Sequence, residues 1–254
     1  MKSKLVFITG ASSGIGEACA RKFAANGAKL ILNARNLSKL EELKNELVSK
    51  YSTSVYLLPF DVRNRESIKE SVNSLPAEWQ NIDILINNAG LVIGVDKEFE
   101  GDLDEWDIVI DTNIKGLLSM TRLIVPGMIE RQTGHIINIG SIAGEAAYPG
   151  GSVYCATKAA VKFLSDGLRI DLVDTPLRVT NIKPGMVETN FSVVRYRGDK
   201  ETADNFYKGI HVLSGDDIAE TVFFAATVPP HIQIAEILVM PTNQATGTIS
   251  YKNK

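Results

Sequence analysis

Apolar and polar positions follow a regular order along the chain. Short runs of β-branched and apolar residues predict buried strands, and longer segments with helical apolar spacing separate them. The expected strands are Leu5–Thr9, Lys29–Ala34, Ser54–Phe60, Ile82–Asn87, His135–Ile139, Leu177–Lys183 and Ile234–Met240. The expected helices are Ile15–Asn26, Leu37–Lys50, Arg65–Leu75, Leu103–Gln132, Gly151–Val173 and Gly215–Thr227.

This alternation of strands and helices predicts parallel strands joined by right-handed crossovers. Most of the strand runs are continuously apolar, as expected for a sheet with helices on both faces. No repeat, linker or low-complexity segment divides the 254 residues, so we expect one doubly wound α/β domain with a seven-stranded parallel sheet over residues 1–254. The segment 188–211 lacks clear periodicity and is expected to form a long loop, a feature that is often functional.

The composition is that of an ordinary globular protein and argues against several classes. The chain is 44% hydrophobic and 22% charged, with a net charge of −3 and no basic stretch, which disfavours a nucleic-acid surface. No apolar run approaches the ~18 residues that cross a bilayer, and the first residues do not form a secretory signal. We therefore expect a cytoplasmic protein that binds neither nucleic acid nor membrane, with Cys19 and Cys155 as reduced thiols.

A glycine-rich turn follows the first expected strand. The sequence Gly10-Ala-Ser-Ser-Gly14-Ile-Gly16 lies between that strand and the helix after it. At such a junction, backbone N–H groups and the helix dipole bind phosphate, and glycines allow a pyrophosphate to approach closely. A glycine-rich turn alone can be merely a loop. The strand before it and the helix after it favour a dinucleotide-binding Rossmann domain.

Tyr154 and Lys158 stand four residues apart in a predicted helix. One helical turn separates them, so the phenol and the ammonium share one helix face. A free tyrosine titrates near pH ~10, and a fixed cation beside it favours the phenolate. We therefore expect Lys158 to lower the pKa of Tyr154 toward the range useful for proton transfer. Tyr-x-x-x-Lys is common by chance, and it gains weight from the glycine turn and from Ser141, which precedes it.

Together these motifs resemble the short-chain dehydrogenase/reductase family over nearly the whole chain. Further matching segments are Asp61-Val62, Asn87-Asn-Ala-Gly90, Thr112-Asn-Ile-Lys-Gly116, Ile139-Gly-Ser141 and Pro184-Gly-Met-Val-Glu-Thr189. The resemblance implies that Asn113, Ser141, Tyr154 and Lys158 are catalytic. In these roles Tyr154 transfers a proton, Ser141 donates a hydrogen bond to the same substrate oxygen, and Asn113 bends its helix and orders a water.

The resemblance also implies a set of cofactor contacts. These are expected from Gly10, Ser12, Ser13, Gly14, Ile15, Gly16, Arg35, Asp61, Val62, Asn88, Ala89, Gly90, Tyr154, Lys158, Pro184, Gly185, Val187 and Thr189. No metal is required, and the three histidines, His135, His211 and His231, have no metal-ligand spacing. Relatives of this family are usually homotetramers, so a homotetramer is expected.

The end of the second expected strand indicates which dinucleotide binds. An NAD-selective site places a carboxylate there for the ribose 2′-hydroxyl. In this chain Ala34 stands at that place and Arg35 follows, and a planar guanidinium suits a 2′-phosphate. NADP is therefore the expected cofactor. Many NADP-binding relatives carry a second basic residue in the glycine turn, where this chain has Ser13.

Several stretches resemble one branch of the family, the NADP-dependent 3-hydroxy acid dehydrogenases that oxidise serine, allo-threonine and similar acids. They are Leu75–Trp79, Met128–Arg131, Phe191–Asp199 and Pro241–Thr246. In the family, the segment matching 188–211 is a mobile lid over the substrate. A carboxylate substrate requires a cation, and both Arg195 and Arg197 of the lid are candidates, with Arg195 favoured by its place in the motif.

Two alternatives stay open at this point. The same catalytic set serves reductases of bulkier or uncharged carbonyl compounds. A catalytically silent NADP-binding regulator is the other alternative, and the presence of all four catalytic residues disfavours it.

Overall fold

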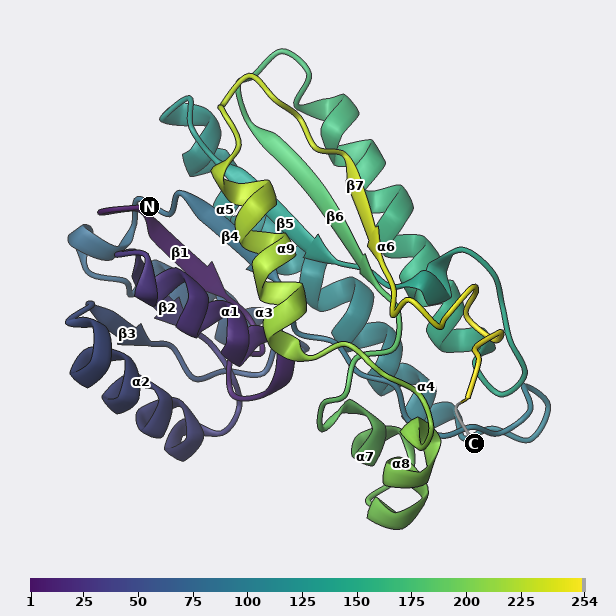
Figure 1. The fold of residues 1–254 in the computed structure, drawn as a ribbon. Coiled ribbons are helices and arrows are strands. Elements are labelled where there is room, and N and C mark those ends of the chain that lie inside the picture. Colours follow the sequence, from purple (N-terminus) through teal and green to yellow (C-terminus); the bar gives the residue numbers. More distant parts are fainter. Residues whose placement is uncertain (253–254) are drawn as a thin grey trace.

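The computed structural model describes residues 1–252 and shows a sheet with helices on both faces (Figure 1). Every pair of neighbouring strands is parallel, and the order is β3-β2-β1-β4-β5-β6-β7. The strands are β1 (Leu5–Ile8), β2 (Lys29–Leu32), β3 (Val55–Leu57), β4 (Ile84–Asn87), β5 (His135–Ile139), β6 (Arg178–Pro184) and β7 (Glu236–Val239). The predicted doubly wound α/β domain with a parallel seven-stranded sheet is confirmed.

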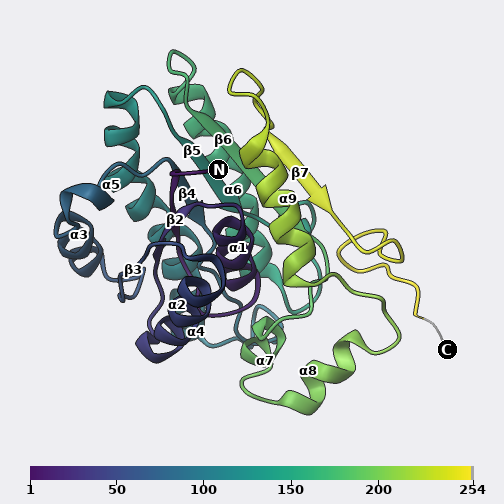
Figure 2. The same ribbon diagram turned by 60° about the vertical axis from the view of Figure 1, so that its left-hand side comes forward.

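Two groups of helices cover the two faces of the sheet (Figures 1 and 2). Helices α1, α2 and α9 pack on one face, and α3, α5 and α6 pack on the other. The α-helices are α1 (Gly14–Ala25), α2 (Leu37–Tyr51), α3 (Arg65–Asn73), α4 (Leu103–Ile110), α5 (Leu117–Glu130), α6 (Ser152–Asp171), α7 (Phe191–Arg195), α8 (Lys200–Tyr207) and α9 (Gly215–Thr227). The shorter helices are η1 (Ala77–Trp79), η2 (Asp111–Gly116) and η3 (Ile142–Gly144).

The strand β1 shows why the strand runs are continuously apolar. Successive side chains of a strand point to opposite faces. Val6 and Ile8 belong to the core under α1, whereas Leu5 and Phe7 belong to the core on the other face. All four are buried, so no position of β1 is left for a polar side chain.

The single helix predicted from Leu103 to Gln132 is three segments in the structure. Helices α4 and α5 are separated by η2, a π-helical turn that contains Asn113. A π-helical turn inserts one extra residue into a helix, and the apolar spacing of the sequence does not reveal it. Such turns are frequent at functional sites. The prediction of a continuous helix was wrong at this point.

The segment 188–211 also differs from the prediction. It contains α7 and α8 instead of an irregular loop, and both lie beyond the carboxyl ends of the strands (Figure 1). Helix α8 begins after Asp199, whose side chain accepts a hydrogen bond from the Thr202 amide. This capping signal was present in the sequence. Across residues 1–252, none of the helices combines the length and the apolar character that crossing a membrane requires.

Candidate active site

A cavity of about 730 Å³ opens at the carboxyl ends of the strands. Its size is typical of ligand sites, and ligands of open α/β sheets bind at this edge. It is lined by loops after β1 to β6, by α7 and α8, and by the segment from Gln244 onward. The predicted residues that line it are Gly10, Ser12, Ser13, Gly14, Ile15, Arg35, Asp61, Val62, Asn88, Ala89, Gly90, Ser141, Tyr154, Lys158, Pro184, Gly185, Val187, Thr189 and Arg195. The cavity lining does not include Gly16 or Asn113, which lie behind it.

The glycine turn forms a tight cradle at one end of the cavity. A Cβ atom at Gly16 would lie 2.4 Å from the Gly10 carbonyl oxygen, so only glycine fits there. Gly10 has a φ of +66°, a conformation that other residues rarely adopt. The Asn88 side chain donates hydrogen bonds to the carbonyls of Thr9 and Gly10, at 2.9 and 3.1 Å, and fixes the turn to the loop after β4. The cradle and the first turn of α1 therefore fit a dinucleotide pyrophosphate.

A positively charged region of the cavity lies where β2 continues into α2. Arg35 and Lys39 both line the cavity, and Ala34 beside them brings no carboxylate. Lys39 stands four residues after Arg35, in the first turn of the 15-residue helix α2. This second cation was not predicted, although its spacing from Arg35 can be read from the sequence. The nearby Asp61 carboxylate is paired with Arg63, at 2.6 Å between Oδ2 and Nη2, so its charge is compensated.

Asn113 connects the π-helical turn to the catalytic helix. Its Oδ1 accepts a hydrogen bond from the Leu91 amide, and its Nδ2 donates to the Leu91 carbonyl, both at 2.9 Å. The same Nδ2 donates to Thr157 Oγ1 at 3.0 Å, and Thr157 in turn donates to the Tyr154 carbonyl. Asn113 therefore fixes α6 against the loop after β4.

Lys158 lies on α6 and is buried. Its Nζ donates to the Ile139 carbonyl at 2.8 Å and lies 5.9 Å from the centre of the Tyr154 ring. Burial lowers the pKa of Lys158 to about 8. The ammonium thus keeps most of its charge at neutral pH, and it points toward β5 more than toward the phenol.

Tyr154 lies on the wall of the cavity, close to Ser141. Burial raises the pKa of the Tyr154 phenol, and the neighbouring Tyr148 raises it further. Hydrogen bonding with Ser141 and the positive charge of Arg195 act in the opposite direction. Lys158, which we expected to lower this pKa, is not among the groups that do so. The physical reason for the upward direction is burial of the phenol, which disfavours the charged phenolate.

Arg195 and Arg197 occupy different environments. The Nε of Arg195 is buried and has no hydrogen-bond partner within residues 1–252. Its guanidinium carbon lies 5.4 Å from the ring centre of Tyr148, 5.7 Å from that of Phe206 and 5.9 Å from that of Tyr196. Arg197 faces away from the cavity and forms ion pairs with two carboxylates, those of Asp96 and Glu105. Of the two candidates, the structure brings only Arg195 to the site.

Tyr148 and Gln244 are among the residues of the cavity wall that were not predicted. Tyr148 stacks on Arg195 from the loop between Ser141 and the catalytic helix, and an aromatic residue in a loop carries no signal of this role. Gln244 accepts a hydrogen bond from the Met186 amide at 2.8 Å and so fixes the segment after Gly185. Among the described residues, no group of His, Cys, Asp and Glu is arranged to hold a metal ion.

Comparison with known proteins places the chain in a family. A family model for short chain dehydrogenases matches residues 4–199. The chain belongs to the short-chain dehydrogenase family. The NADP-dependent 3-hydroxy acid dehydrogenase of Salmonella typhi is 47% identical over 247 residues, which cover 97% of this chain and 98% of that protein. The sulfoacetaldehyde reductase of Chromohalobacter salexigens is 44% identical over 241 residues, 94% of each chain.

A solved structure of a relative agrees with this assignment. The closed form of serine dehydrogenase complexed with NADP⁺ has a TM-score of 0.93 to this structure and 45% sequence identity, and the match covers 98% of this chain and 100% of that one. The family resemblance inferred from the motifs is therefore confirmed. As a member of this family, the protein is an oxidoreductase.

Proposed function

We propose that the protein is an NADP-dependent dehydrogenase of small 3-hydroxy acids such as serine, allo-threonine or 3-hydroxypropionate. The observation that carries the proposal is the environment of Arg195. Its guanidinium lies at the cavity among aromatic rings, and its buried Nε has no partner in residues 1–252. A buried N–H donor without a partner is costly, and the acid group of a substrate provides that partner. The relatives' names, which refer to 3-hydroxy acids and to sulfoacetaldehyde, support a small acidic substrate.

NADP is the cofactor that the cavity fits. The glycine cradle accepts the pyrophosphate, and Arg35 with Lys39 provides two cations for the 2′-phosphate. The bound cofactor accepts or supplies the hydride in the reaction. Ala34 leaves room beside Arg35 where a carboxylate would repel that phosphate.

The catalytic residues act on the proton and on the substrate oxygen. The Tyr154 hydroxyl transfers the proton to or from this oxygen. The Ser141 hydroxyl donates a second hydrogen bond to the same oxygen and stabilises the charge that develops there. Lys158 contributes a cation below them, and Asn113 keeps the orientation of α6 through Thr157.

The segment 188–211 completes the site as a lid. Phe191 of α7 packs on the ring of Tyr154, with 5.6 Å between ring centres, and excludes water from that side. Arg195, at the end of the same helix, then holds the acid group while the hydroxyl-bearing carbon faces Tyr154. A fixed acid group orients a small substrate that offers little apolar surface.

A small sulfonate aldehyde is a second candidate substrate. A guanidinium binds sulfonate and carboxylate oxygens through the same donors. The sulfoacetaldehyde reductase of Chromohalobacter salexigens, at 44% identity, favours this candidate. Reductases of uncharged carbonyls use the same catalytic set, but such a substrate leaves Arg195 without an acid partner.

A substrate panel tests the proposed function. Oxidation of serine, 3-hydroxypropionate and 3-hydroxyisobutyrate is followed with NADP⁺ and with NAD⁺. Reduction of sulfoacetaldehyde and of an uncharged ketone of similar size is followed with NADPH. We expect the highest kcat/KM with a 3-hydroxy acid and NADP⁺. A higher kcat/KM with the uncharged ketone would contradict the proposal.

We also propose how the protein assembles and where it is located. Exposed apolar side chains on α6 and α9, at Phe163 (72% exposed), Ile170 (71%) and Phe224 (57%), support a homotetramer built from these helices. Sedimentation of the purified protein measures this directly. The expectation of a cytoplasmic enzyme stays a prediction, and it is compatible with the buried free thiols of Cys19 and Cys155.

A further inference from the structure

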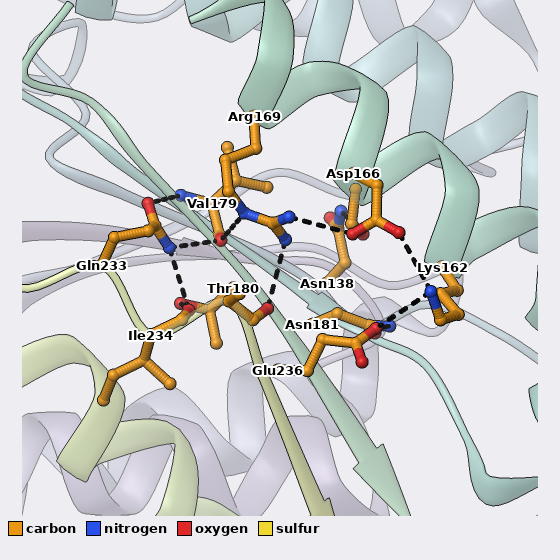
Figure 3. Close-up of polar contacts among 12 residues, drawn as sticks. Asn138, Lys162, Asp166, Arg169, Val179, Thr180, Asn181, Gln233, Ile234 and Glu236 are labelled. Carbon is orange, nitrogen blue, oxygen red and sulfur yellow. Dashed lines mark hydrogen bonds and ion pairs between the residues drawn. The ribbon is translucent and has the colours of Figure 1, made fainter. Parts of the chain in front are cut away.

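A continuous chain of alternating charges links α6, β7, β6 and the end of η3. We call it the charge chain, and its members in order are Arg169, Asp166, Lys162, Glu236, Lys183 and Glu145. The successive nitrogen–oxygen distances are 2.9, 3.0, 3.9, 2.7 and 2.9 Å. Figure 3 shows its first four members, with Asp166 between Arg169 and Lys162, and Glu236 opposite Lys162. None of the six side chains has a role in the reaction described above.

Lys183 is the most buried member of the charge chain. Its side chain is 8% exposed, whereas the side chains of Glu145 and Glu236 are 40% and 27% exposed. Its ammonium donates to both carboxylates, at 2.9 and 2.7 Å. A charge at this depth is tolerated only when it is paired, and two carboxylates pair with Lys183 here. A lysine at a buried strand position therefore requires an explanation beyond packing.

The charge chain reaches α6, which carries Tyr154 and Lys158, and the segment that carries Ser141. Lys183 directly precedes Pro184, the first residue of the segment that lines the cavity after β6. Glu145 directly follows η3, whose N-cap is the catalytic Ser141. Lys162 lies one helical turn after Lys158 on α6. The ion pairs Lys183–Glu145 and Lys183–Glu236 thus join the serine segment to β6 and β7 at the border of the site.

The other end of the charge chain is anchored to backbone. Arg169 donates to the carbonyls of Val179 and Ala235, at 3.4 and 3.3 Å. Gln233 donates to the same Val179 carbonyl at 2.7 Å and accepts from the Val179 amide (Figure 3). These contacts fix the C-terminal half of α6 against β6 and the segment before β7. The N-terminal half of α6, which carries Tyr154, is therefore continuous with a half whose position is fixed.

We infer that Lys183 is a positioning residue for catalysis, which acts through Glu145 on the Ser141 hydroxyl. By holding η3 to β6, it sets the position of Ser141 relative to Tyr154 and to the cavity segment at Pro184. The inference rests on the proposed roles of Ser141 and Tyr154. The competing explanation is that the charge chain contributes to folding stability and has no effect on the geometry of the reaction.

Replacement of Lys183 by methionine tests the inference. Lys183→Met keeps most of the length of the side chain and removes the charge, so the serine segment loses its ion pair with β6 and keeps the Gly140 amide bond to the Ile182 carbonyl. We expect kcat to fall about 10- to 100-fold, as a displacement of about 1 Å in a reacting geometry does. The primary deuterium isotope effect on hydride transfer, measured with deuterated NADPH, should rise because chemistry becomes slower. The Kd for NADPH should change by less than about threefold, and Lys183→Arg should restore most of kcat.

Arg169→Met is the matched control, because it removes a charge from the far end of the same chain. All variants are assayed at the same temperature interval below their own melting temperatures. We expect Arg169→Met to lower the melting temperature with little change in kcat or in the isotope effect. Equal kcat losses in Lys183→Met and Arg169→Met, or an unchanged isotope effect in Lys183→Met, would overturn the inference.

Glu145→Gln keeps the test valid if Lys183→Met does not fold. It leaves the Lys183–Glu236 pair intact and weakens only the contact to the serine segment. A lower kcat with a nearly unchanged melting temperature supports the inference, and a wild-type kcat overturns it. Each kcat of a variant is compared with the kcat of the wild type, measured with the best substrate of the wild type. A wild-type protein without turnover would contradict the proposed function, and this inference with it, whereas an active wild type with unaffected variants contradicts this inference alone.

Discussion

The guanidinium carbon of Arg195 lies 5.4 Å from the ring centre of Tyr148. Arg195 belongs to the lid, whereas Tyr148 belongs to the loop between Ser141 and the helix that carries Tyr154. A cation on an aromatic face is stabilised most where water is excluded. This contact holds the charge of the lid beside the catalytic hydroxyls, and the buried Nε of the guanidinium has no hydrogen-bond partner within residues 1–252. That N–H donor stays available for an acid group.

Replacement of Arg195 by alanine tests the recognition of the acid group. Arg195→Ala removes a charge-assisted hydrogen bond from a substrate that has little else to hold it. We expect kcat/KM for serine or 3-hydroxypropionate to fall by roughly 1.5–3 kcal/mol, the range for hydrogen bonds to charged groups. Steady-state kinetics with both substrates and with an uncharged ketone measures the difference.

Arg197→Ala is the control for this experiment. It removes a lid arginine that pairs with Asp96 and Glu105 and does not line the cavity. We expect it to affect charged and uncharged substrates equally. If Arg195→Ala also causes equal losses with both kinds of substrate, Arg195 supports the lid and does not bind the acid.

The parts of the site that were predictable depend on local spacing. The glycine turn between β1 and α1, the pair Tyr154 and Lys158, and the missing carboxylate at Ala34 each follow from neighbours in sequence. Local spacing could not show which of Arg195 and Arg197 lies at the site. The difference depends on Asp96 and Glu105, which are about 100 and 90 residues away and satisfy only one of the two arginines.

The same reasoning explains the error about Tyr154. Helical spacing places Lys158 on the face of Tyr154 but does not reveal what else the ammonium contacts. The Ile139 carbonyl, contributed by β5, receives its hydrogen bond. Burial of the phenol depends on the lid residue Phe191, which packs on it from a distant segment. Both effects are tertiary, so the sign of the pKa shift could not be predicted from the spacing alone.

Cofactor preference is tested at the end of β2. The double variant Ala34→Asp with Arg35→Ala introduces a carboxylate for a ribose hydroxyl and removes a cation for the 2′-phosphate. Both changes act in the same direction, through added repulsion and lost attraction. We expect the ratio of kcat/KM for NADP⁺ over NAD⁺ to fall by at least about 100-fold. An unchanged ratio would place the specificity elsewhere, with Ser13 as the next residue to test.

Lys39 provides a separate test of the 2′-phosphate site. Lys39→Met retains the helix and removes the second cation that lines the cavity near Arg35. We expect NADPH to bind about tenfold more weakly, as for loss of one charge-assisted contact, with the Kd for NADH unchanged. Lys50→Met, in the last turn of the same helix and outside the cavity, is the control. A similar loss for both dinucleotides would mean that Lys39 acts only on the structure of α2.

The proton donor is tested by Tyr154→Phe. This change removes the transferable proton and keeps the ring that packs on Phe191. We expect kcat to fall by at least ~100-fold, the lower range for general acid–base catalysis, while NADPH binding measured by fluorescence stays nearly constant. Turnover within a few-fold of wild type would show that another group transfers the proton.

The last prediction concerns stability at low pH and the buried His135. Burial, and then the positive charge of Arg178, lower the pKa of His135 to about 3. In the unfolded chain this imidazole titrates near pH ~6.5. Below that pH the unfolded state therefore binds a proton at His135 that the folded state does not bind. The contribution of neutral His135 to the free energy of unfolding is therefore fully present above about pH 6.5, and it is lost as the pH falls toward 3.

Urea unfolding of wild type and His135→Gln at pH 7.5 and pH 5.0 measures this effect. Between these two pH values, proton uptake by the unfolded state should lower the free energy of unfolding of the wild type by about 2 kcal/mol more than that of the variant. The glutamine amide can still bond with the Thr180 hydroxyl, which lies 2.8 Å from the His135 Nε2. The absolute stability of the variant does not enter the comparison, because only the change with pH is compared. If the free energy of unfolding falls equally in the two proteins over this range, His135 does not stay unprotonated in the folded state as proposed. The acid sensitivity then arises from the carboxylates.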